Sequence, residues 1–233
     1  MKRKIKNKLL NWLSPVYFLQ RDLDYLTRLA LANVVSIDSF WLDLGCGLQP
    51  YKNEFKYSKY IGIDVEISGR SEILKNTEIY FDGKNIPFKN DSFDGILSTQ
   101  VLEHVSDIHQ ILHECNRVLK KNGVMIISVP FAYREHELPF DFRRFTQVGM
   151  EDLLVIHGFQ IIDIITINTN WECLAMLFAS FISTNFSARN KFWFYATMPF
   201  LFISLRIARL LNFIIPGNNE IYSCVLTTAR KID

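Results

Sequence analysis

Short apolar runs, each followed by a glycine or a polar residue, recur along the chain from residue 40 onward. Between the fourth and fifth runs the apolar residues recur every three or four positions, from Ile108 to Leu119, which predicts a helix. Strands that alternate with helices indicate βαβ units, and therefore an α/β fold with a parallel sheet and right-handed crossovers. The predicted strands lie in 40–47, 59–65, 78–82, 93–98, 123–129, 159–167 and 221–229.

The ends of two helices can also be placed. Lys120 to Gly123 supply a basic last turn and a stop for the helix that begins near Ile108. Thr146 is a good first cap for a second helix, which we expect to run to about His157 and to stop at Gly158.

The predicted elements divide the chain into three parts. A basic segment with helical spacing occupies 1–35, and its Leu9–Tyr17 stretch suits either a membrane-surface helix or a helix that covers the sheet. The α/β domain occupies 36–167 and 221–233. The intervening 168–220 is mostly apolar and aromatic, and we expect it to be a hydrophobic helical insertion, because a compact domain rarely contains so long a structureless connection.

The insertion is too short in its charge-free stretches to span a bilayer. Cys173–Ala188 has sixteen residues without a charge and Phe192–Leu205 has fourteen, whereas a spanning helix needs roughly twenty. Its aromatic residues suit a membrane interface. Peripheral membrane contact, a homodimer interface and a lid over the substrate are the three alternatives.

Composition excludes several classes of protein. Apolar residues make up 49% of the chain, so a large core is expected. The net charge of +2 conceals a basic start. Beyond it the acidic residues outnumber the basic ones, so we expect no nucleic-acid partner. The basic residues of this start are Lys2, Arg3, Lys4, Lys6 and Lys8.

The four cysteines, Cys46, Cys115, Cys173 and Cys224, lie far apart and form no Cys-x-x-Cys pair. This spacing indicates neither a metal site nor a disulfide framework. Reduced thiols in a cytoplasmic protein are the simplest interpretation. No signal peptide is indicated, because Pro15 interrupts the apolar stretch near the start and no cleavage site follows.

The first predicted strand ends in two glycines, Gly45 and Gly47, where a ligand could approach the backbone. Pro50 occupies the position at which a dinucleotide fingerprint requires Gly or Ala, so a nicotinamide-dependent oxidoreductase is disfavoured.

Polar residues end the neighbouring strands, at the edge where open α/β sheets bind their ligands. Asp64 can accept hydrogen bonds from ribose hydroxyls, and Asp82 can accept one from the amine of a base. These two, together with Asp43, Ser98 and Gln100, predict a nucleoside crevice.

Four motifs occur in order: Leu42–Gly47, Ile86–Asp94, Val101–Val105 and Arg117–Gly123. Together they resemble the signatures of class I S-adenosylmethionine-dependent methyltransferases, most closely the small-molecule branch typified by quinone-biosynthesis enzymes, over about residues 39–167. The resemblance implies a Rossmann-like, doubly wound sheet of seven strands with the last strand antiparallel. It also implies that backbone from Gly45 through Cys46 to Gly47 contacts the methionine part of the cofactor, with ribose at Asp64 and adenine near Asp82. Leu48-Gln49-Pro50 and the expanded connection before the last strand depart from the family pattern.

Candidate residues for the acceptor lie in Phe131–Phe145, after the fifth strand. His136 is the predicted general base, because imidazole titrates near neutrality. Glu135, Asp141 or Tyr133 could orient it. Arg143 or Arg144 could hold an anionic acceptor bidentately, and Tyr133 is also a candidate for acceptor binding.

Among the other histidines, His104 is interpreted as structural. The run from His136 to Phe145 is similar to methyltransferases of surface-polysaccharide and lipid-linked sugar assembly.

The sequence therefore predicts an S-adenosylmethionine-dependent methyltransferase that O-methylates a lipid-linked, glycan or small-molecule acceptor. Its predicted location is cytoplasmic, with possible peripheral contact on the inner face of the membrane. The alternative is a catalytically inactive scaffold of the same fold that binds a membrane or a protein.

Overall fold

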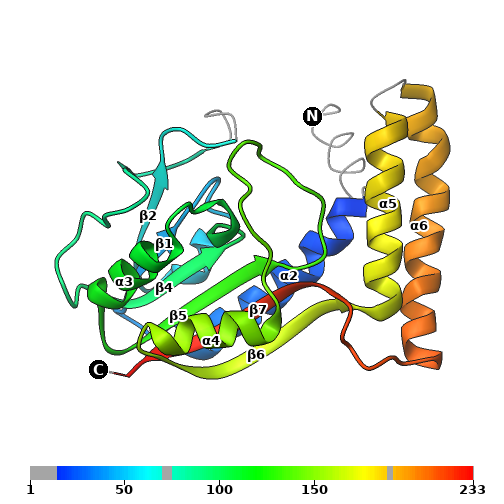
Figure 1. Ribbon diagram of the computed structural model, residues 1–233. Coiled ribbons are helices and arrows are strands. Elements are labelled where there is room, and N and C mark those ends of the chain that lie inside the picture. The colour runs from blue at the N-terminus through cyan, green and yellow to red at the C-terminus, as the bar shows by residue number, and fades with distance from the viewer. Residues whose placement is uncertain (1–14, 70–74, 188–190, 233) are drawn as a thin grey trace. The chain divides into compact units, whose positions relative to one another are not determined.

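A computed structural model describes residues 15–69, 75–187 and 191–232 (Figure 1). It divides into two compact units. Unit 1 comprises the described residues up to 25, with 132–134 and 166–224, and unit 2 comprises 26–131, 135–165 and the residues from 225 onward. The basic residues of 2–8 and most of the predicted 9–17 helix lie outside the described residues.

Seven strands form one sheet in the order β3-β2-β1-β4-β5-β7-β6. β1 pairs in parallel with β2 and with β4, β2 pairs with β3, and β4 pairs with β5. The bounds are β1 Phe40–Leu44, β2 Lys59–Val65, β3 Ile79–Phe81, β4 Phe93–Thr99, β5 Leu119–Pro130, β6 Phe159–Thr169 and β7 Tyr222–Lys231. All seven predicted strands are confirmed.

The last strand, β7, runs antiparallel to its neighbours, as the resemblance implied (Figure 1). Near the start of β7, the Ser223 carbonyl accepts a hydrogen bond from the Ala132 amide just after the end of β5, at 3.1 Å. Near its end, Lys231 Nζ donates to the Leu119 carbonyl at the start of β5, at 2.6 Å. The start of β7 therefore lies beside the end of β5, and the end of β7 lies beside the start of β5, as in an antiparallel pair.

The two helices whose ends the sequence predicted both belong to unit 2. α3 (Ile108–Val118) is capped by Asp107, whose side chain accepts from the Gln110 amide, and its buried face repeats every three or four residues. α4 (Gln147–Ile156) begins after Thr146, whose hydroxyl accepts from the Gly149 amide, and ends before Gly158, which has φ +81°. The predicted bounds of α4 are confirmed.

The predicted end of α3 is wrong. The helix stops at Val118, and β5 already begins at Leu119. Lys120 is therefore a strand residue, and its Nζ lies 2.8 Å from Asp94 Oδ1 on the neighbouring strand β4. Strand pairing with β4 prevails over the local helix signal because the pairing buries Leu119 fully.

Fewer helices lie between the strands than the alternation suggested. Between β1 and β2 there is a single 3-10 turn, η1 (Lys52–Phe55), and a second one, η3 (Leu102–His104), follows β4. Glycine and polar loops make the remaining described connections. At the N-terminal side, α2 (Pro15–Val34) precedes β1 and places Leu31 in the core with no exposed surface.

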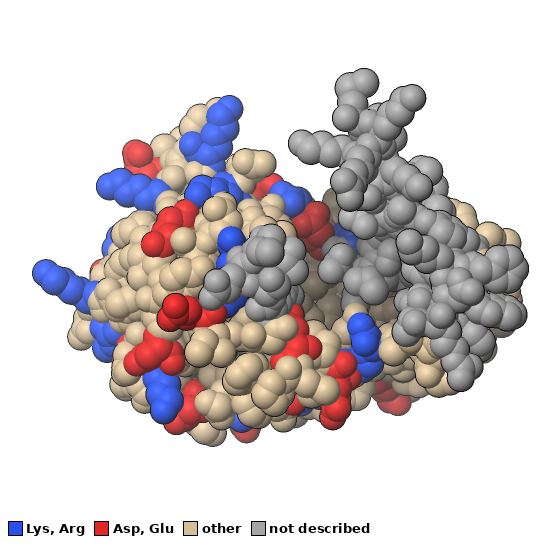
Figure 2. Space-filling model, turned by 90° about the horizontal axis from the view of Figure 1, so that it is seen from above, with Lys and Arg blue, Asp and Glu red and all other residues tan. Residues whose placement is uncertain are grey.

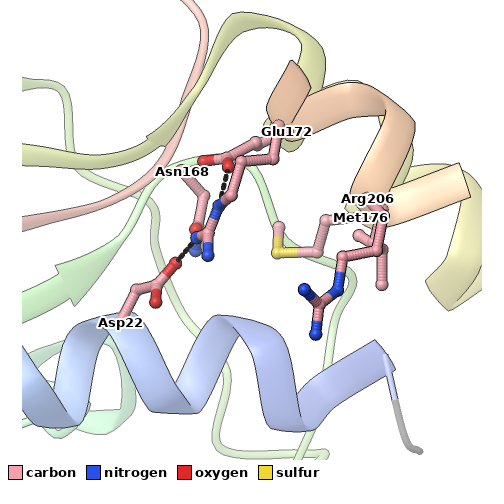
Figure 3. Close-up of a pocket in the computed structure, with 7 residues that line it drawn as sticks. Asp22, Asn168, Glu172, Met176 and Arg206 are labelled. Carbon is pink, nitrogen blue, oxygen red and sulfur yellow. Dashed lines mark hydrogen bonds and ion pairs between the residues drawn. The ribbon is translucent and has the colours of Figure 1, made fainter. Parts of the chain in front are cut away.

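Two long helices, α5 (Asn170–Ser187) and α6 (Lys191–Ile214), form a hairpin in unit 1. Their inner faces bury Met176 and Leu205, with Tyr133 packed against them. Arg209 of α6 forms ion pairs with Glu172, at 2.6 Å, and with Asp22 of α2 (Figure 3). Among the described helices, none has both the length and the apolar character required to cross a bilayer.

Lys, Arg, Asp and Glu side chains are interspersed over the face of unit 2 that Figure 2 displays. No single sign of charge dominates the described part of that face.

Candidate functional site

The turn after β1 is held by hydrogen bonds to β2. The amides of Gly45 and Cys46 both donate to the Ile63 carbonyl, at 2.8 and 3.1 Å. The Gly47 amide donates to Asp64 Oδ2 at 3.0 Å. Gly45 has φ +72°, and a Cβ there would lie 2.4 Å from the side chain of Val101, so only glycine fits.

A cavity of about 320 Å³ opens at the carboxyl ends of β1, β2, β3 and β4, all within unit 2. Its volume lies within the range of small-molecule sites, which is about 300–1,000 Å³. Four of the predicted site residues line it: Gly45, Asp64, Asp82 and Gln100. Apolar side chains, including Val65 and Phe81, supply flat surfaces for a ring.

The carboxylate of Asp82 is held by its own loop. It accepts from the amides of Lys84 and Asn85, at 2.8 and 2.7 Å, and from the Asn85 side chain. These bonds to Asn85, followed by that to Lys84, lower the pKa of Asp82. The charged loop therefore forms one rim of the cavity.

Four predicted residues are buried and do not line the cavity: Asp43, Cys46, Gly47 and Ser98. Asp43 accepts a hydrogen bond from the Tyr60 hydroxyl, and burial raises the pKa of Asp43 to about 7. Burial likewise raises the pKa of the Cys46 thiol to about 12, so this thiol is unreactive. Their direct contact with a ligand was a prediction that the cavity lining does not support.

His136 lies beside the cavity rather than in its lining. Its Nδ1 is 3.3 Å from Asp141 Oδ2, and its amide donates to the same oxygen. Burial, and then the neighbouring His104, lower the pKa of His136. Since the neutral form dominates at pH 7, His136 can accept a proton.

Asp141 is fixed by Arg144. The guanidinium contacts both carboxylate oxygens, at 2.5 and 2.7 Å, while the Asp141 side chain is fully buried. The hydrogen bond from Arg144 lowers the pKa of Asp141 to about 2. Arg144 is thus a positioning residue for Asp141, and the prediction that it holds an acceptor is not supported.

Three further predictions for this segment need correction. Arg143 donates to the carbonyls of Val105 and Ser106, so its guanidinium bridges backbone. Tyr133 belongs to unit 1, where it packs in the apolar core of the hairpin. Glu135 is exposed, and Asp141 is the carboxylate that contacts His136.

Sequence reasoning missed the role of His104 and its neighbours. His104 lines the cavity, and its ring centroid lies 4.7 Å from that of His136. Glu137 also lines the cavity. Glu103 is completely buried beside them, and burial raises its pKa to about 8. The adjacent Glu and His in the Val101–Val105 motif were the available signal, but nothing in their spacing pointed to His136.

Residues 42–127 match the family model described as "Methyltransferase domain". A ubiquinone biosynthesis O-methyltransferase of Rhodopseudomonas palustris is 27% identical over 100 residues, which cover 37% of this chain and 38% of the relative. Phosphoethanolamine N-methyltransferase 2 of Haemonchus contortus, solved with S-adenosyl-L-methionine, superposes with a TM-score of 0.55 at 14% identity, over 90% of this chain and 53% of the other.

Over residues 42–127 the chain is similar to the methyltransferase domain family. This similarity implies S-adenosylmethionine as the cofactor.

A relative of this methyltransferase domain in Methanocaldococcus jannaschii, the uncharacterized protein MJ0638, is 32% identical over 129 residues, which cover 54% of this chain and 56% of the relative. The chain thus spans about half or less of the length of the curated relatives described here.

The cavity of the methyltransferase domain fits its cofactor. Asp64 offers carboxylate oxygens at the end of β2 for ribose hydroxyls, and Gly45 lets the backbone turn without a side chain. Val65 and Phe81 line the same cavity and would give adenine an apolar contact. Gly45 and Asp64 are residues that the sequence predicted for the cofactor, and their roles stay predictions.

Proposed function

We propose that the protein transfers a methyl group from S-adenosylmethionine to an oxygen atom of its acceptor. The observation that carries this proposal is a set of proton acceptors beside the cofactor cavity: His104 lines the cavity and touches His136. An oxygen acceptor must lose a proton as it gains the methyl group, so the site needs such a group. When bound, the cofactor supplies the methyl group in an already activated sulfonium.

His136 is the group that we assign to take the acceptor's proton. The neutral imidazole is favoured by its lowered pKa, and the Asp141 carboxylate stabilises the imidazolium that forms on protonation. Arg144 holds Asp141 in place for this purpose. The rest of catalysis is alignment of the acceptor with the methyl group.

A lipid-linked or glycan acceptor is supported by the surface of the α5–α6 hairpin. Large apolar side chains are exposed along one face of each helix, and Phe178 of α5 meets Phe200 of α6 with ring centroids 6.2 Å apart. The exposed positions are Trp171, Leu174, Phe178 and Phe181 on α5, and Phe200, Ile203, Ile207, Leu210 and Ile214 on α6. A continuous apolar face of this size requires a partner or a membrane.

The charged side chains that the structure describes in the hairpin, Glu172, Arg206 and Arg209, are not among these apolar positions. Arg209 forms ion pairs with Glu172 and with Asp22 at a small pocket in unit 1. Arg206 lines the same pocket (Figure 3). We therefore propose that the apolar face lies on the surface of a membrane, on its cytoplasmic side, where a lipid-linked acceptor is presented. A second copy of the chain is the competing occupant.

Flotation with anionic liposomes tests the membrane contact. Ile207→Glu with Leu210→Glu places two charges on the apolar face, and Val148→Glu, on the exposed surface of α4, is the matched control. We expect the wild-type protein and the control to float and the double variant to remain in solution. A wild-type protein that stays in solution as a dimer, dissociated by the double variant, would identify the face as a dimer interface instead.

Calorimetry with S-adenosylmethionine tests the enzyme itself. We expect one binding site per chain, and methyl transfer from labelled cofactor to hydroxylated lipid-linked sugars or quinone-like acceptors. A protein that binds no cofactor would instead be the inactive scaffold. Transfer confined to amines would refute the oxygen acceptor, and His136→Gln would then have no effect on the rate.

A further inference from the structure

Three buried polar atoms without a hydrogen-bond partner meet beside the cofactor cavity. They are both carboxylate oxygens of Glu103 and Nε2 of His104, and Glu103 is 0% exposed. Each such atom costs about 1–3 kcal/mol when it is left unsatisfied. Unpartnered buried groups that cluster in this way indicate an ion or water that completes them.

The hydrogen bond of His104 shows which of its ring nitrogens carries the proton. Its Nδ1 lies 2.8 Å from the Phe140 carbonyl, which can only accept, so Nδ1 carries the proton. Nε2 then presents a lone pair, and it faces Glu103 Oε1 at 3.8 Å and Glu137 Oε2 at 4.0 Å. A lone pair that faces two carboxyl groups is unfavourable unless a proton or a metal ion lies between them.

His136 adds a ring nitrogen to the same cluster. The ligand atoms offered by Glu103, His104 and His136 all lie within 4.8 Å of one another. The two rings stand edge to face, at an interplanar angle of 76°. A single proton can join only two of these atoms, whereas a metal ion can bind all three.

We propose that Glu103, His104 and His136 bind one divalent first-row metal ion. Two imidazoles with one carboxylate match catalytic zinc and related sites, which keep a position open. Ligands about 2.1 Å from an ion in tetrahedral geometry lie about 3.4 Å apart. The side chains therefore need to close by roughly 1 Å around the ion.

Two contacts already hold the ligands as metal sites require. The Phe140 carbonyl fixes the tautomer and orientation of His104, and Asp141 holds the backbone amide of His136 and lies 3.3 Å from its Nδ1. Such carboxylate and carbonyl partners commonly orient the histidines of metal sites. The Phe142 amide also donates to the Glu103 carbonyl at 2.9 Å, which ties the two segments together.

The open position of the ion faces the cofactor cavity, because His104 and Glu137 line it. If the proposed oxygen acceptor is correct, its hydroxyl occupies this position, and coordination lowers the hydroxyl pKa. With the metal bound, His136 is a ligand and the acceptor's proton passes to solvent, whereas in the metal-free protein the imidazole takes the proton as proposed above. This role rests on the proposed function, but the binding of the metal does not.

No sequence pattern indicated this site, because its ligands come from η3 and from the loop after β5. Their separation in the chain matches no metal-ligand spacing. The expectation that the protein has no metal site is revised by this proposal.

Metal binding can be measured on the full chain without cofactor or acceptor. Chelator-treated protein is titrated with MnCl₂, followed by electron paramagnetic resonance, and with ZnCl₂, followed by calorimetry. Manganese is the more selective probe because the four buried cysteines favour zinc. We expect one equivalent of each metal per chain. MgCl₂, whose ion prefers an all-oxygen octahedron, should bind much more weakly.

Glu103→Gln and His136→Asn are the test variants, and His109→Asn is the matched control. His109 and His157 stack with ring centroids 5.1 Å apart, outside the cluster. We expect each test variant to weaken manganese binding at least tenfold and the control to leave it unchanged, with thermal melts showing that all three fold. No stoichiometric binding by the wild-type protein, or equal binding by Glu103→Gln, would overturn the proposal.

A methyltransferase assay separates this proposal from the function proposed above. Transfer that survives the chelator, in a protein that binds no metal, would leave the oxygen methyltransferase standing and refute the metal site. Metal binding by a protein that methylates no hydroxyl would support the metal site and refute the oxygen methyltransferase.

Discussion

The carboxylate of Asp64 accepts a hydrogen bond from the Gly47 amide at 3.0 Å, which ties the end of β2 to the glycine turn after β1. Its second oxygen accepts from the Val65 amide at 2.8 Å. Asp64 is therefore already held in one orientation at the cavity, so its lone pairs are placed before a ribose arrives.

Removing this carboxylate should weaken cofactor binding. Asp64→Ala deletes charged hydrogen bonds that are worth about 1.5–3 kcal/mol, so we expect the dissociation constant for S-adenosylmethionine to rise about 10- to 100-fold. Calorimetry measures this change directly. Asp163→Ala removes an exposed acid of β6 and should bind like the wild type. Equal affinities for wild type and Asp64→Ala would contradict the assigned ribose contact.

Gly45 should tolerate no side chain. Gly45→Ala places a Cβ against Val101 and keeps φ at +72°, which together should cost about 2–4 kcal/mol of the free energy of unfolding. In the double variant with Val101→Ala the steric part should be recovered and the backbone part should persist. Urea unfolding of the four proteins separates the two parts. Purely additive effects would show that Val101 is not the obstacle.

The burial of Asp43 predicts that stability depends on pH. Its pKa is about 7 in the folded protein, against an ordinary value of 3.8, so the folded state binds this proton more tightly than the unfolded state. The stability that Asp43 contributes is therefore fully present below about pH 4 and is lost as the pH rises to about 7. We expect the free energy of unfolding to fall by about 1–3 kcal/mol between pH 5 and 8 through this group.

Asp43→Asn should remove this part of the pH dependence. Tyr60→Phe should extend it to higher pH, because the Tyr60 hydroxyl stabilises the charged carboxylate. Urea unfolding at pH 5, 6, 7 and 8 measures both effects. A wild-type profile that Asp43→Asn leaves unaltered would show that Asp43 titrates normally.

Arg117, which the sequence analysis matched to a family motif, has a structural role. Its guanidinium contacts both oxygens of Glu114, at 2.7 Å, and donates to the carbonyls of Ile86 and Phe88. It thereby fastens the loop before β4 to α3. Arg117→Ala should lower the free energy of unfolding by about 2–3 kcal/mol in urea titrations.

Lys89→Ala removes a nearby exposed cation and should cost less than about 0.5 kcal/mol. Comparable losses in the two variants would mean that net charge, and not the guanidinium contacts, stabilises this loop. Arg117→Lys keeps the charge but loses the bidentate guanidinium contact, and we expect it to lower the free energy of unfolding about as much as Arg117→Ala.

Local sequence determined most of the fold. Strands such as 40–44 and the 124–130 part of β5 are nearly continuous apolar runs, which are typical of a sheet covered on both faces, so their pattern alone predicts them. Helix α4 was equally predictable from the sequence, because Thr146 and Gly158 mark its ends through contacts within a few residues. The end of α3 was not, because pairing with β4 decides it.

The candidate site was predictable only where one strand end supplies one residue. Gly45 and Asp64 follow from strand ends, because the carboxyl ends of parallel strands meet at one edge. The partners of charged side chains depend on where distant segments meet. Arg144 was predicted to bind an acceptor but binds Asp141, and Arg143 binds backbone carbonyls of another loop.

The sequence by itself indicated the resemblance to methyltransferases, the seven strands and the ligand-binding edge of the sheet, since these depend on period and on short motifs. Tertiary structure decided which polar residues share an environment. Burial of Glu103 next to His104 and His136 joins residues from separate segments into one cluster. No local pattern encodes this proximity, because it arises only when the loop after β5 folds back on η3.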